Sequence, residues 1–334
     1  MPVRNHNLDI VRCIAIICVI CIHSMGKLNE YIDTASIEIN YITYLFLSSI
    51  IHMGVPLFVM LSGALLLGKS ENPSFFLRKR FQRIFIPFFI WSIIVFCLSK
   101  ITNHQPLSII QSTTEFSIEF LTNGVHGVYW YIYMLTGLYL LTPILQKVFK
   151  DISPELCNYT IILTTSLIII QHIVPTINEK NSLLFKYLFP YLIYLGYYIG
   201  GYYLYTYANK SKYFQKVMIY GFLICYLIGI INTIDSFTSF PIQFFQSVFF
   251  FGILISMKFQ ISTSKRQYLI TFISNTSYGI YLSHFLFISL LYKIKFEETV
   301  PTFITPILIT FIVLCIEIGL QYSIKKFKLE KLLQ

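Results

Sequence analysis

The chain has 334 residues, of which 56% are hydrophobic, 17% aromatic and only 12% charged. Soluble domains carry about 25% charged residues, and half that share cannot cover a globule of this size with a solvated surface. Together with a mean hydropathy of +0.68, this composition argues against a soluble enzyme and against a disordered chain. It predicts an all-α, polytopic integral membrane helix bundle.

The net charge of +10 comes from 25 Lys and Arg against 15 Asp and Glu. In a membrane protein such an excess indicates which side of the bilayer holds the cations, so it is not evidence for a nucleic acid partner. The seven cysteines lie mostly in apolar runs and are interpreted as small buried hydrophobes. No metal site is predicted, because His23, His52 and His284 lie in separate predicted helices.

Ten segments are long and apolar enough to span a bilayer, since a spanning helix needs about 20 mainly apolar residues. They cover residues 8–26, 41–67, 84–100, 128–146, 158–175, 186–207, 217–234, 239–257, 268–292 and 302–324. Ten spans place both termini on one side, and most of the Lys and Arg residues then fall on that side, which predicts cytoplasmic termini. The longest polar gap, residues 101–127, is too short for a soluble domain. We therefore expect a single transmembrane domain over residues 1–334, with no separate soluble domain.

The first predicted span is interrupted by Asp9, Arg12 and His23. Arg12 and His23 are eleven residues apart, which is about three helical turns, so both are expected on one face roughly 16 Å apart. Ionisable groups at this depth are expensive and are therefore functional candidates. At this point an equally open alternative is a snorkelling Arg12 and a hydrogen-bonded core histidine.

The second predicted span contains Pro56, which frees a backbone carbonyl, and the small residues Gly54, Ser62 and Gly63. This pattern favours a kinked, tightly packed helix over direct chemistry.

A basic segment follows on the predicted inner face, with Arg78, Lys79, Arg80 and Arg83 in six positions. For a generic transporter an ordinary positive-inside anchor would be the favoured interpretation. However, Arg80 and Arg83 are three residues apart on a predicted helix and would face one target together. Paired guanidinium groups suit a phosphate-rich cytosolic ligand.

Further polar residues lie in the later spans. Ser277, Tyr281 and His284 fall on overlapping faces of the ninth span, and Glu317 lies within the tenth, where it needs a partner. Trp130 begins the fourth span, where an aromatic belt at the outer surface is as good an interpretation as a site.

Taken together, these segments resemble the membrane acyltransferase family 3, the O-acyltransferases that modify bacterial polysaccharides and lipid-linked sugars. The matching motifs are, in chain order, Leu8-Asp9-x-x-Arg12-x-x-Ala15 ending in His23 (the family's Arg-x10-His signature), Gly54-Val55-x-Leu57-Phe58 with Ser62-Gly63, Lys79-Arg80-x-x-Arg83 before Pro87, Trp130-Tyr131, and Ser277-Tyr278-x-x-Tyr281-Leu282-x-His284. The resemblance covers essentially the whole chain. The chain departs from the family in two respects. Pro56 and Val59 stand in a stretch where many members differ, and the extracytoplasmic hydrolase-like domain of some members is absent. The second departure suggests that transfer finishes within the membrane domain or on a separate partner.

The resemblance implies an acyl-CoA-dependent acyltransferase of the bacterial plasma membrane. It would move an acetyl or succinyl group from cytosolic acyl-CoA to a hydroxyl of a cell-surface polysaccharide or lipid-linked sugar. His23 would act as general base or as acyl carrier, and Arg12 would orient the donor or stabilise negative charge. Lys79, Arg80 and Arg83 would bind acyl-CoA. The acceptor-side or supporting candidates are Ser62, Trp130, Ser277, Tyr281, His284 and Glu317.

The same resemblance implies no permanently bound cofactor. The expected partners are acyl-CoA, the glycan or lipid-linked sugar, membrane lipids and, as an open option, a glycan synthase. The rival class is a polysaccharide exporter or lipid-linked glycan flippase, which the sequence disfavours because it contains no inverted repeat and no matching pair of broken helices. A structural subunit of a glycan synthase is a third interpretation.

Overall fold

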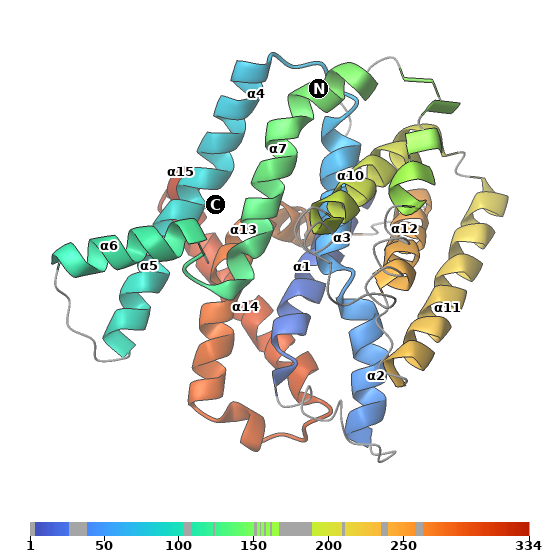
Figure 1. Cartoon of the computed structure of the whole chain (residues 1–334). Helices are drawn as coiled ribbons and strands as arrows, with labels where there is room; N and C mark the ends of the chain where they lie inside the picture. Colours follow the sequence, from blue (N-terminus) through green and yellow to red (C-terminus); the bar gives the residue numbers. More distant parts are fainter. Residues whose placement is uncertain are drawn as a thin grey trace, which may run out of the picture.

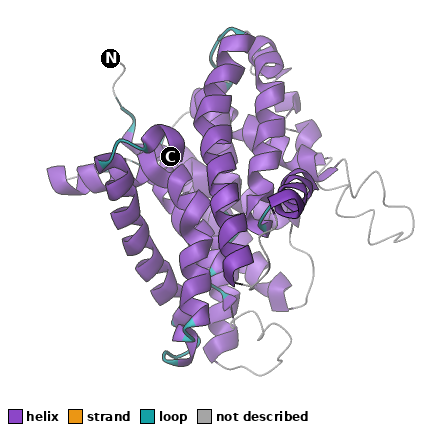
Figure 2. Ribbon diagram, turned by 90° about the vertical axis from the view of Figure 1, so that its left-hand side faces the viewer, coloured by secondary structure: helices purple, strands orange, loops and turns teal. Residues whose placement is uncertain are grey.

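The computed structural model describes residues 4–26, 39–102, 109–122, 124–149, 189–208, 211–234, 240–257 and 263–333, with residue 259 and short pieces between 152 and 166. Over these residues the chain is helical, with no strand (Figures 1 and 2). The all-α prediction is confirmed for this part of the chain.

The principal helices follow the predicted order. They are α1 (His6–His23), α2 (Ile39–Ile51), α3 (Gly54–Leu66), α4 (Pro73–Arg80), the π-helical turn η2 (Phe81–Phe85), α5 (Ile86–Thr102), α6 (Ile109–Thr122), the 3-10 turn η3 (Gly127–Tyr129), α7 (Trp130–Phe149), α10 (Phe189–Tyr207), α11 (Lys212–Ile234), α12 (Phe240–Ser256), α13 (Ser264–Lys293), η5 (Phe296–Glu298), α14 (Thr305–Lys326) and α15 (Glu330–Leu333).

Six helical ranges among the described residues are long and apolar enough to cross a membrane. They are His6–His23, Ile39–Leu66, Pro73–Thr102, Gly127–Phe149, Lys212–Ile231 and Thr305–Lys326. The chain therefore has the helices of a multi-pass membrane protein. The number of ten spans and the cytoplasmic side of the termini remain predictions, and much of the predicted span 158–175 lies outside the described residues.

The second span is interrupted at His52 and Met53, between α2 and α3, just before Pro56. Proline has no N–H, so the carbonyl of His52, four residues earlier, loses its helical partner. The Gln243 Nε2 group of α12 donates to that oxygen at 3.0 Å. The carbonyl that Pro56 frees is thus satisfied by a neighbouring helix, as it must be where no water is present.

The helix that contains the basic segment widens just before a second proline, Pro87. Residues Phe81–Phe85 form a π-helical turn, which closes with a hydrogen bond from the Ile86 N–H to the Phe81 carbonyl. Tyr278 of α13 donates its hydroxyl to the Ile84 carbonyl at 2.7 Å. Such π-turns occur frequently at functional sites.

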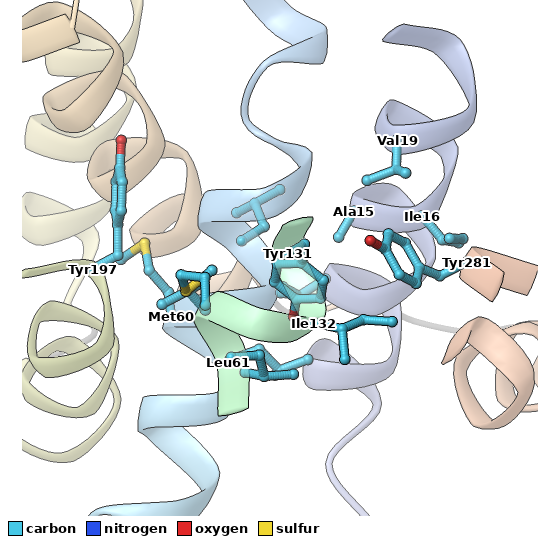
Figure 3. Close-up of a cluster of buried hydrophobic side chains, with 14 of the residues drawn as sticks. Ala15, Ile16, Val19, Met60, Leu61, Tyr131, Ile132, Tyr197 and Tyr281 are labelled. Atoms are coloured by element: carbon cyan, nitrogen blue, oxygen red, sulfur yellow. The ribbon is translucent and has the colours of Figure 1, made fainter. Parts of the chain in front are cut away.

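The core lies where α1, α3, α7, α10 and α13 meet. Figure 3 shows the buried side chains there, including Ala15, Ile16 and Val19 of α1, Met60 and Leu61 of α3, Tyr131 and Ile132 of α7, Tyr197 of α10 and Tyr281 of α13. These helices position the residues of the site described below.

The polar gap predicted over residues 101–127 contains a helix. In Figure 1, α6 runs across the direction of α5 and α7. The rings of Phe116 and Phe120 pack on Phe89 of α5 at 5.9 and 5.5 Å, and Lys100 pairs with Glu115. The aromatic face of α6 therefore makes this segment part of the folded domain.

Helices α3 and α10 approach each other closely, and this approach depends on glycine. A Cβ atom at Gly201 would collide with the Met60 carbonyl, and one at Gly63 with the Tyr198 carbonyl. Small residues allow helix backbones in membranes to approach closely in this way.

We expect Gly201→Ala to destabilise the protein by about 1–3 kcal/mol, the usual cost of overpacking. The matched control is Gly200→Ala, since a Cβ there meets nothing within 4 Å, and alanine in a helix is favoured over glycine by about 1 kcal/mol. Thermal unfolding in detergent measures both variants. Equal unfolding temperatures for the two would contradict the close approach at Gly201.

Candidate active site

A cavity of about 280 Å³ opens between α1, α3, the α4–η2 segment, α7 and α13. This volume is close to the lower end of the range for small-molecule sites, about 300–1,000 Å³. Five cationic side chains line it: Arg12, Lys69, Lys79, Arg80 and Arg83. No acidic residue of the described part of the chain lines it. A lining of this charge attracts anions and repels cations.

The α4–η2 segment supplies three of these cations, because α4 and the π-helical turn direct them to one side. The Arg80 guanidinium lies over the rings of Phe76 and Tyr139, at 5.1 and 5.7 Å. Its Nε atom is buried and has no hydrogen-bond partner. Arg78 is exposed and does not line the cavity. Lys79, Arg80 and Arg83 of this segment thus line the cavity, whereas Arg78 does not.

Arg12 is held by a short relay between α1 and α13. Its Nη1 donates to Ser274 Oγ at 3.1 Å, and Ser274 Oγ donates in turn to Asp9 Oδ1 at 2.7 Å. Arg4 forms a two-pronged ion pair with Asp9, at 2.7 and 2.8 Å. Ser274 therefore links Arg12 to a carboxylate whose charge is already compensated by Arg4, and Arg12 keeps its positive charge facing the cavity.

Two tyrosines form the end of the cavity remote from the α4 cations. The rings of Tyr131 and Tyr281 meet edge-to-face at 5.3 Å. The Tyr281 hydroxyl donates to the Val128 carbonyl, and the Tyr129 hydroxyl donates to the Leu282 carbonyl at 2.9 Å. These reciprocal bonds attach the start of α7 to α13 and hold the wall in place.

His23 lies beyond this wall and does not line the cavity. Its ring is 5.3 Å from that of His284, which in turn is 5.9 Å from the ring of Tyr281. His284 is fully buried. Because Arg12 contacts α13 at Ser274 and His23 contacts it at His284, the two α1 side chains share one face, as their spacing predicts.

The remaining predicted residues divide into two groups. Ser62 and Ser277 line the cavity. Glu317 does not; it is buried elsewhere and accepts hydrogen bonds from Ser283 at 2.7 Å and Gln321 at 3.2 Å. Trp130 is 44% exposed and packs on Tyr194 at 5.6 Å, outside the cavity. Glu317 and Trp130, which were candidates for supporting roles, therefore make no direct contact with this cavity.

Three further residues line the cavity although the sequence motifs predict no site role for them: Lys69, Tyr139 and Ser274. Lys69 follows α3, where a lysine is typical of the predicted cytoplasmic side, while Tyr139 lies in the middle of an apolar helix. Ser274 could have been predicted as a site residue, since it begins the run of polar residues that leads into the ninth-span motif.

The described residues contain no group of three or more His, Cys, Asp or Glu placed to hold a metal ion. His52 directs Nδ1 to the Ser48 carbonyl of its own helix turn at 2.6 Å.

The chain thus combines a cation-lined cavity beside a histidine pair with a bundle of apolar helices, the features of an integral membrane protein with an internal polar site. The sequence model of an acyltransferase domain, that of acyltransferase family 3, matches residues 5–320. The chain therefore belongs to this family and is a membrane acyltransferase. No curated protein and no solved structure matches it.

Proposed function

We propose that this acyltransferase takes an acetyl or succinyl group from cytosolic acyl-CoA and transfers it to a hydroxyl of a cell-surface polysaccharide or lipid-linked sugar, in a bacterial plasma membrane. The proposal is carried by one observation: five cations and no described acid line a cavity whose far wall separates it from a histidine pair. The family supplies the reaction class.

The positive charge of the cavity supports acyl-CoA as the donor. Coenzyme A has a phosphate-rich head and a slender thioester arm, and guanidinium groups bind phosphate oxygens in pairs. Arg80 and Arg83 take the phosphates, and the unpartnered Nε of Arg80 gains an acceptor there. The arm then fits the cavity between Ser62 and Ser277, and it leads past Arg12 toward Tyr131.

The chemistry takes place at the far end of the arm, where the wall of Tyr131 and Tyr281 must open, because it separates the cavity from His23. His23 removes the proton from the acceptor hydroxyl, and the oxygen attacks the thioester carbonyl. The new C–O bond forms, the C–S bond breaks, and the proton passes to the departing thiolate. Arg12 lies roughly 16 Å back along α1, so of its two predicted roles it takes that of orienting the donor. A covalent acyl-His23 intermediate is the alternative course.

Arg80→Ala combined with Arg83→Ala should weaken acyl-CoA binding about tenfold or more, because a hydrogen bond to a charged group contributes about 1.5–3 kcal/mol. The matched control is Arg78→Ala, which removes a positive charge from the same helix outside the cavity. Titration calorimetry in detergent measures both dissociation constants. Unchanged affinity in the double variant would reduce the cluster to a topology anchor.

His23→Ala should lower the rate of acyl transfer in membranes by about 10²–10⁴-fold, the usual contribution of a general base. His52→Ala serves as control, since this histidine bonds the Ser48 carbonyl of its own helix turn and has no role in the proposed reaction, and its activity should match wild type. Full activity of His23→Ala at normal expression would remove His23 from the mechanism.

Mass spectrometry of surface glycans with and without the gene tests the whole reaction. We expect O-acyl groups to disappear while the glycan itself is still exported. Retained esters with failed export would instead favour the exporter or flippase.

A further inference from the structure

His284 has one ring nitrogen satisfied and one without a partner. Its Nδ1 lies 2.8 Å from the Tyr281 carbonyl, and its Nε2 is buried with no hydrogen-bond partner. A carbonyl oxygen can only accept, so Nδ1 carries the proton. In the neutral ring Nε2 is then a bare acceptor, and a buried acceptor left unpaired costs about 1–3 kcal/mol.

The neighbouring side chain that can donate a hydrogen bond to His284 Nε2 is His23. The Tyr281 hydroxyl is already donated to Val128, and Phe285, whose ring is 6.1 Å from that of His284, has no polar hydrogen. His126 stacks on Phe285 at 4.0 Å, and of the two described histidines near His284 it is His23 whose ring contacts the His284 ring. The ring centroids of His23 and His284 are 5.3 Å apart. An N–H···N bond of about 2.9 Å between nitrogens that each lie roughly 1 Å from their centroids fits this spacing once the rings turn toward each other.

We propose that His284 is a positioning residue for the acyl transfer, because its Nε2 accepts the ring N–H of His23 and so fixes the tautomer and direction of that base. This inference rests on the proposed function, in which His23 is the base. The opposite nitrogen of His23 is then bare and free to take the proton of the acceptor hydroxyl. When it does so, His23 becomes an imidazolium, and its bond to His284 becomes charge-assisted and stronger. The proton leaves again to the thiolate of the departing CoA.

A neutral orienting group suits this depth in the bilayer. A nucleophile or base is commonly oriented by a third group, often a carboxylate, but an ionised carboxylate near the bilayer centre costs at least about 2.5–3.5 kcal/mol. The Tyr281 carbonyl fixes the His284 ring, and that ring orients His23 as a carboxylate would, but without a net charge. Glu317, the described carboxylate on α14, instead hydrogen-bonds Ser283 and Gln321.

Two substitutions at His284 separate orientation from packing. His284→Gln keeps an acceptor oxygen near the place of Nε2, whereas His284→Phe keeps the ring and removes the acceptor. We expect kcat to fall about 10- to 100-fold in His284→Phe, in line with a hydrogen bond to a charged group, and several-fold less in His284→Gln. The dissociation constant of acyl-CoA should stay at the wild-type value in both, because His284 does not line the cation-lined cavity.

Which of the two variants keeps the higher kcat decides whether the inference holds. If His284 only filled space, Phe would be tolerated better than Gln; that order, or a wild-type kcat in His284→Phe, overturns the inference while leaving the proposed function intact. His284→Asn, whose side chain is too short to reach His23, replaces the Phe variant if the latter does not accumulate, with the same expected loss. Absence of any transfer by the wild-type protein overturns the proposed function, and this inference with it.

Discussion

The structure depends on one constraint: inside a bilayer each polar group must find its partner within the protein, because no water is there to replace it. The Asp9 carboxylate is satisfied by Arg4 and Ser274. The carbonyl that Pro56 frees is satisfied by Gln243. Among the buried polar atoms of the described residues that remain unpartnered are Arg80 Nε and His284 Nε2. One lies at each end of the candidate site, and under the proposed function the donor phosphates and His23 supply the missing partners.

Helix α13 connects these two ends. Starting from the end of the bundle predicted to be cytoplasmic, it contributes Ser274 to the Arg12 relay, Ser277 and Tyr281 to the cavity lining, and His284 to the histidine pair. Helix α1 runs beside it and presents Arg12 and His23 to it. The site is thus built along the contact between two helices, rather than on a loop, and rigid elements of this kind hold reacting groups in place.

Much of this could be predicted from the sequence where a residue's role follows from helical period or from charge. The shared face of Arg12 and His23 follows from spacing alone, and the break near Pro56 follows from the missing N–H. Tertiary contacts could not be predicted in this way: Tyr139 is one aromatic among many until Arg80 packs on it, and Trp130 belongs to a motif yet packs on Tyr194 outside the cavity. The sequence of residues 101–127 predicts only a polar gap, because the role of the α6 aromatic residues depends on their contacts with α5.

The distribution of charge along the site suits a donor with two unlike ends. Cations gather around Arg80 and Arg83, whereas the deeper groups, Tyr131, Tyr281 and the histidine pair, have neutral hydroxyls and rings. Transfer of an unpaired ion into that deeper region is strongly unfavourable, so a phosphate-bearing head stays where the cations are. An uncharged thioester on a long arm meets no such penalty. Under the proposed function, the same gradient that binds the donor also limits how far it enters, and it brings the carbonyl, not the phosphates, to His23.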